Sequence, residues 1–175
     1  MKKDDNKHLY KDRMYRITFY DPHWHDQFEQ YASMLQRIFI DARIEHIGST
    51  SVPGMCGKFS IDVLVIVNDL KTAEEHRDEM VHAGFDYAGQ FVMDDSRLFR
   101  MMRDNILLAN IHFFPVGHPH IEEMLGLRNY LRSNPDEVTA YSRLKNELYA
   151  KYPNDYASYR RYKDVYMNEL IKRAS

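Results

Sequence analysis

The chain has little cysteine, no long apolar run and no excess of one charge. Cys56 is the only cysteine, so neither an internal disulfide nor a metal site of paired cysteines can form. The longest apolar stretch, Val63 to Val67, is too short to span a bilayer, and no apolar segment follows the polar N-terminus. The 24 basic residues nearly balance the 26 acidic ones, so net charge would not attract duplex nucleic acid. These absences predict a cytoplasmic protein without membrane or duplex nucleic-acid partners, in which a local cluster must hold any nucleotide.

Repeats, low-complexity tracts and Gly/Ser linkers are also missing, which predicts one domain over residues 1–175 with a loose tail over 1–15. Ile61 to Val67 is apolar on both faces, as is typical of a central strand, and Asp104-Asn105 separates two strand patterns like a hairpin turn. The remaining patterns predict a strand over 43–47 and helices over 22–42, 71–83, 118–133, 135–151 and 155–173. This order of elements predicts an α/β (α+β) fold, a sheet flanked by helices with a C-terminal three-helix segment.

The segment between the two strands at 43–47 and 61–67 combines glycines with hydroxyl side chains. It runs from Gly48 through Ser49, Thr50 and Ser51 to Lys58. Glycines permit tight turns, and hydroxyls and backbone amides donate to anions, so this composition suits phosphate. It is not a Walker A loop, because Val52 and Phe59 stand where a glycine and a hydroxyl residue are required, and no G-x-G-x-x-G is present. An ordinary glycine-containing connection is the alternative.

Each predicted C-terminal helix carries one cation on an otherwise apolar face. These cations are Arg128, Lys145 and Lys163. An inward-facing cation must reach water, pair with an acid or point to a bound anion. We therefore expect the three to converge on the phosphates of a nucleotide-like ligand near Ser49 and Thr50. The alternative is ion pairing with acids such as Glu45, Asp62 or Glu122.

The stretch from Ile44 to Gly54, followed by Lys58 and Ile61-Asp62-Val63, resembles the signature of the GrpB family. The resemblance extends over nearly the whole chain, through Tyr20-Asp21-Pro22 near the start, Ile111 to Pro115, and motifs in the three C-terminal helices. It implies a nucleotidyltransferase-like mixed β-sheet flanked by helices. It also implies that the Gly48-Ser49 turn grips nucleotide phosphates, and that carboxylates including Asp62 hold Mg²⁺ for in-line transfer.

The chain departs from that pattern where further carboxylates are expected. Leu64 stands where a second acid usually follows Asp62, and the later strand has Asn110 and His112 in place of a third. One carboxylate, one imidazole and one amide form a poor octahedral Mg²⁺ site. Glu45, Asp94 or Asp95 could supply an acid only if the fold brings one beside Asp62. Hydrogen-bonded structural roles are the alternatives for Asp62 and His112.

The sequence thus predicts a protein that binds a nucleotide or another phosphate-bearing small molecule. If it is catalytic, it transfers a nucleoside monophosphate to a small acceptor, with Mg²⁺ on Asp62. The competing hypothesis is a non-catalytic module for a nucleotide, a coenzyme A-like ligand or a partner protein. The candidate catalytic residues are Asp62, His112 and Asn110, and the candidate phosphate-binding residues are Gly48, Ser49, Thr50, Ser51, Lys58, Arg128, Lys145 and Lys163.

Overall fold

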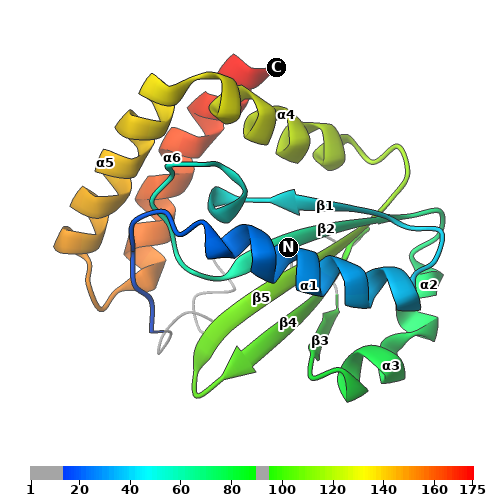
Figure 1. The fold of residues 1–175 in the computed structure, drawn as a ribbon. Helices are drawn as coiled ribbons and strands as arrows, with labels where there is room; N and C mark the ends of the chain where they lie inside the picture. Colours follow the sequence, from blue (N-terminus) through cyan, green and yellow to red (C-terminus); the bar gives the residue numbers. More distant parts are fainter. Residues whose placement is uncertain (1–13, 90–94) are drawn as a thin grey trace.

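The computed structural model describes residues 14–89 and 95–175, and its centre is a five-stranded mixed sheet (Figure 1). The strands are β1 (Arg43–Ile47), β2 (Ile61–Val67), β3 (Asp86–Gly89), β4 (Arg97–Arg103) and β5 (Ile106–Pro115). They lie in the order β1-β2-β5-β4-β3, and β2 pairs with β5 in parallel while the other neighbours are antiparallel. The predicted fold class is confirmed.

Helices cover both faces of this sheet. They are α1 (His23–Ile38), α2 (Lys71–Glu75), α3 (Arg77–His82), α4 (Pro119–Ser133), α5 (Pro135–Lys151) and α6 (Tyr156–Ala174). One face packs its alternate apolar residues, such as Val63 and Phe113, against α1, α2 and α3. The other face places Leu64 and Phe114 under α4. In Figure 1, α5 and α6 stand side by side at the left, next to the loop that joins β1 to β2.

Most predicted boundaries agree with these elements within one or two residues. The hairpin turn is confirmed, because Asp104 and Asn105 both have positive φ, as a two-residue turn of this kind requires. The helix predicted over 71–83 is instead two short helices, separated where His76 leaves the helical conformation (φ −94°, ψ 15°). The short strand β3 was not predicted from the sequence. It pairs only with β4, and its register shifts between Tyr87 and Gly89, so it shows no clear alternation.

The loop between β1 and β2 contacts both the segment before α1 and the C-terminal helices. Thr18 and Gly57 exchange backbone hydrogen bonds (2.9 and 3.1 Å), which fixes the loop to the segment before α1. Val52 and Met55 of the loop are fully buried against apolar residues of α4, α5 and α6. The loop is therefore a packed connection that ties the sheet to the C-terminal helices, and not a free surface segment.

None of the helices in the described ranges is long and apolar enough to cross a membrane.

Candidate functional site

Three of the predicted site residues meet on the sheet face that carries α4. The parallel register pairs Asp62 of β2 with Asn110 of β5, and Leu64 with His112. Asn110 Nδ2 donates to Asp62 Oδ1 at 2.8 Å. His112 Nε2 lies 3.6 Å from the same oxygen, which is beyond an ordinary hydrogen bond but close enough for electrostatic attraction. The structure thus brings Asp62, Asn110 and His112 together.

Asp62 is held as a carboxylate in this setting. Burial would raise its pKa, but His112, the positive charge of Lys58 and the Asn110 amide together lower the pKa below the ordinary value of an aspartate. About a quarter of the side chain (27%) remains exposed to solvent. Asp62 is therefore an ionised group at the edge of the sheet face, with one of its oxygens already engaged by Asn110.

Position 48 requires a glycine, because the Asp62 carboxylate lies close to the backbone there. Its φ is +73°, and a Cβ added there would lie 2.7 Å from Asp62 Oδ2. Only glycine combines that backbone conformation with that space. Gly48 leads into a single turn of 3-10 helix over Ser49–Ser51, closed by hydrogen bonds from the Ser51 amide (3.2 Å) and hydroxyl (2.6 Å) to Gly48 O.

The hydroxyls of the turn have different partners. Ser51 Oγ caps the turn itself, and Thr50 Oγ1 is bonded to buried His46 at 2.9 Å. Only Ser49 directs its hydroxyl to the C-terminal helices. Within residues 14–89 and 95–175, no backbone carbonyl accepts from the amides of Ser49 or Thr50, so the start of the turn keeps donors for a ligand.

Lys145 of α5 is the helix residue that meets Ser49. Its Nζ lies 2.6 Å from Ser49 Oγ and donates to Cys56 O at 2.7 Å, and it stands 4.2 Å from the centre of the Tyr141 ring. Only 1% of the residue is exposed. Burial, together with the like charges of Lys163 and Lys58, holds the pKa of Lys145 well below its usual value of 10.5.

Two further lysines face the same region. Lys58, on the loop, donates to Tyr156 Oη of α6 at 2.6 Å and lies over the ring of that tyrosine. Lys163 of α6 is 2.9 Å from Asp164 Oδ1. Burial would lower the pKa of Lys163, but Tyr141 and Asp164 outweigh burial and raise it. We call Lys58, Lys145 and Lys163 the lysine cluster.

Arg128 lies apart from the lysine cluster. Its Nη1 donates to Glu45 Oε2 at 2.7 Å and to His46 O at 2.9 Å, which is the ion pairing that the sequence left as the alternative. One turn further along α4, Arg132 donates to Ser51 O from Nε (2.9 Å) and Nη2 (2.7 Å). Arg132 was missed by the sequence reasoning, although its spacing of four residues from Arg128 places both on one helix face.

The donors around Asp62 do not fit a two-magnesium site. Among the described residues, no three His, Cys, Asp or Glu side chains are grouped so that they could hold a metal ion. Glu45 lies opposite Leu64 in the sheet, but Arg43 and Arg128 bind its carboxylate. Asp95 pairs with His118 at 2.9 Å, and Asp94 lies outside the described residues. The amide of Asn110 faces Asp62 with its donor, which leaves a single carboxylate for a hard cation.

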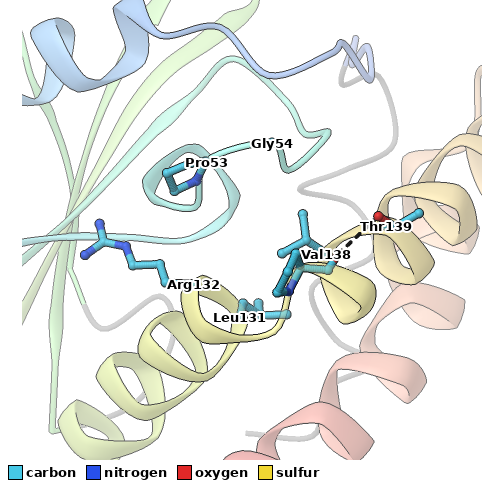
Figure 2. A pocket seen from close by; sticks show the side chains of 7 residues that line it. Pro53, Gly54, Leu131, Arg132, Val138 and Thr139 are labelled. Carbon is cyan, nitrogen blue, oxygen red and sulfur yellow. Dashed lines mark hydrogen bonds between the residues drawn. The ribbon is translucent and has the colours of Figure 1, made fainter.

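A cavity of about 530 Å³ lies on another side of the loop. Figure 2 shows Pro53 and Gly54 facing Val138 across it, with Arg132 directed away from Val138. Neither Ser49 nor Asp62 lines this cavity, and most of its wall is apolar. It is therefore separate from the polar site.

The arrangement defines a class of fold. The mixed sheet of five strands with its flanking helices is similar to nucleotidyltransferase-type folds, as solved structures show. The fold is similar to a cytoplasmic RNA terminal U-transferase (TM-score 0.54, 17% identity), covering 77% of this chain and 41% of that one. It is also similar to the Cid1 poly(U) polymerase solved with MgGTP (TM-score 0.53, 16% identity), covering 77% of this chain and 44% of that one. These likenesses concern the fold alone.

The chain belongs to the GrpB protein family, whose model matches residues 15–173. The crystal structure of the conserved protein GrpB from Enterococcus faecalis superposes with a TM-score of 0.86 at 33% identity, covering 91% of this chain and 96% of that one. YqkA of Bacillus subtilis is 31% identical over 169 residues, which are 95% of this chain but only 49% of YqkA. The glutamate-rich protein GrpB of Alkalihalophilus pseudofirmus is 30% identical over 89% of this chain and 92% of its own length. The chain thus spans about half of YqkA and nearly all of the other two relatives.

Proposed function

We propose that this protein binds a phosphate-bearing small molecule of the nucleotide type, with its phosphates between the Gly48-Ser49 turn and the lysine cluster. The observation that supports this most is the gathering of three lysines from three separate segments of the chain, one of which, Lys145, meets the Ser49 hydroxyl. Lys58 comes from the loop, Lys145 from α5 and Lys163 from α6, and the charges of Lys58 and Lys163 both act on Lys145.

The balance of charge around the cluster favours an anionic ligand. The hydrogen bonds of Lys58 and Lys145 that hold them in place go to neutral oxygens. Lys163 pairs with Asp164, whose carboxylate also lies 3.5 Å from Arg160. Like charges held together in a protein are costly unless an anion compensates them. Besides Asp164, the carboxylate of Asp62 interacts electrostatically with this cluster, through Lys58. A phosphate group would supply the missing negative charge.

The nucleotide is proposed as the ligand class because of the fold. Solved neighbours of the same fold include a polymerase bound to MgGTP and a terminal U-transferase. For this chain we propose binding without a two-metal transfer step, because Leu64 and Asn110 replace carboxylates and Asp62 stands alone as an oxygen ligand. A coenzyme A-type molecule would offer the same phosphate chemistry to the same cations.

Isothermal titration calorimetry in EDTA tests the proposal with ATP, GTP, UTP, inorganic triphosphate and coenzyme A. The wild type is compared with Lys58→Ala and Lys163→Ala. Lys172→Ala serves as the matched control, because Lys172 is an exposed lysine on α6 that pairs with Glu169. Loss of one charge-assisted contact costs about 1.5–3 kcal/mol, so affinity should fall roughly tenfold or more in both cluster variants and stay unchanged in the control. Equal affinity in all four proteins, or no binding of any ligand, would refute the proposal.

A further inference from the structure

Ser49 and Lys145 form a close pair at the centre of the site. Their Oγ and Nζ atoms are 2.6 Å apart, although the residues are 96 positions apart in the sequence. We infer that Ser49 is a nucleophile toward phosphorus, with Lys145 as a neutral amine that takes the proton of its hydroxyl. The inference rests on the proposed function, since the substrate would be the phosphate-bearing ligand, a phosphate ester or anhydride with a good leaving group.

The three contacts of Lys145, which an ammonium group would make as a donor, can also be made by a neutral amine. Such an amine has two N–H bonds and one lone pair. One N–H points to Cys56 O at 2.7 Å, the second faces the Tyr141 ring at 4.2 Å, and the lone pair can accept the Ser49 hydroxyl. Each of the three contacts then has a donor and an acceptor, with the proton of Ser49 directed at nitrogen.

The surroundings of Lys145 favour that neutral form. Lys163 from α6 and Lys58 from the loop act on it with charge of its own sign and lower its pKa, whereas the Cys56 thiol of the loop acts in the opposite direction. From its own helix it meets the Tyr141 ring, and from the loop it meets the peptide oxygen of Cys56. In the described part of the chain its hydrogen bonds go only to neutral groups, and desolvation with the repulsion from Lys163 and Lys58 outweighs the opposing effect of Cys56 and lowers its pKa.

Ser49 is placed to react and not only to pack. It is half-buried, whereas its neighbours Thr50 and Ser51 are buried. Gly57 lies against it, and a Cβ at Gly57 would stand 2.8 Å from Ser49 Cβ, so the glycine makes room for the serine side chain. A serine fixed by its neighbours and bonded to a desolvated amine has the arrangement of an activated nucleophile.

The proposed reaction is a displacement at phosphorus. Ser49 Oγ forms a bond to phosphorus while the bond from phosphorus to the leaving group breaks and the leaving group keeps the electron pair. The proton of the hydroxyl passes to Lys145 Nζ, which becomes an ammonium group. Lys58 and Lys163 neutralise the negative charge of the phosphoryl group and the leaving group.

A fluorophosphonate probe tests the nucleophile directly, because an activated serine displaces its fluoride and gains a stable phosphonyl group. We expect intact-protein mass spectrometry to show one adduct, and peptide mapping to place it on Ser49. Labelling should be absent in Ser49→Ala and at least ~100-fold slower in Lys145→Met, the loss typical when a general base is removed. The labelling rate of the wild type should rise with pH and level off below pH 10.5, the usual lysine value. Ser133→Ala and Lys71→Met, at exposed positions, should label like the wild type.

Lys145→Arg gives a second and independent comparison. Arginine stays charged at every accessible pH and cannot accept the proton, so labelling should also be lost in this variant. Thermal melting shows whether Lys145→Met and Lys145→Arg are folded, and the comparison uses whichever of these two variants folds. No adduct on the wild type, an adduct elsewhere, or a folded Lys145 variant that labels at the wild-type rate would overturn the inference. If the protein binds nucleotides but is not labelled, only the role of Ser49 as a nucleophile is refuted. If it is labelled but binds no nucleotide, only the proposed ligand class is refuted.

Discussion

Replacement of Lys145 by methionine is predicted to change how the stability of the protein depends on pH. The amino group is buried, and burial with two neighbouring lysines lowers its pKa in the folded state well below the 10.5 of an unfolded lysine. Between these two values the unfolded chain binds one proton more than the folded chain. The free energy of unfolding of the wild type therefore rises with pH across that window, by up to about 1.4 kcal/mol per pH unit.

Methionine has a similar shape and no proton to bind, so the variant lacks this contribution. The stability of the wild type relative to Lys145→Met should therefore be lowest below the lowered pKa and rise with pH up to 10.5, above which it levels off. At about pH 7 the variant should match or exceed the wild type, because burying the lysine costs free energy whether it keeps its charge or gives up its proton.

Urea denaturation of both proteins at intervals of half a pH unit measures this difference. Titration of the tyrosines affects both proteins, and therefore cancels in the comparison. A difference in unfolding free energy that stays constant from about pH 7 to about pH 10 would show that Lys145 has an ordinary pKa when folded. A difference that falls over the same range would show that an anion stabilises its charged form. Either result would refute the reasoning.

Two further predictions concern residues that build the site. Gly48→Ala should cost roughly 2–3 kcal/mol of stability, because it combines a φ of +73° with a Cβ only 2.7 Å from the Asp62 carboxylate. Gly117→Ala, at φ +83° with no atom within 4 Å of its Cβ, should cost about 1 kcal/mol in the same denaturation assay. Equal losses would show that Asp62 does not press on Gly48. A double-mutant cycle of Glu45→Gln and Arg128→Met should give a coupling energy of about 1 kcal/mol at neutral pH. Burial would raise the pKa of Glu45, but Arg128 and Arg43 lower it below 4.5, so the coupling should persist above pH 4.5 and vanish as pH falls through the lowered value. No coupling at neutral pH would contradict the half-buried ion pair.

The parts of the fold that were predicted correctly are those that local patterns determine. The strand Ile61–Val67 shows a continuous apolar run, and prolines mark the starts of α4 and α5. β3 was missed because four residues at a sheet edge leave no periodic signal. The break at His76 was missed because helix propensity alone gives no reason to stop there.

The site was less predictable because its contacts are distant in sequence. Helical spacing identified Arg128 and Lys145 as cations on apolar faces and left Ser49 and Glu45 among their candidate partners, but it could not decide which cation meets which group. Arg128 meets Glu45 across 83 positions, and Lys145 meets Ser49 across 96. The parallel pairing of β2 with β5, which brings Asn110 to Asp62, is equally non-local. The binding and catalytic roles of these residues stay predictions.

The most direct test is the position of a bound triphosphate in a crystal structure of the complex. We predict electron density for its phosphates within hydrogen-bond distance of Lys58 Nζ and the Ser49 hydroxyl, between the loop and α6. Density in the apolar cavity beside Pro53 and Val138, or cations of the lysine cluster that leave the phosphates uncontacted, would contradict the account.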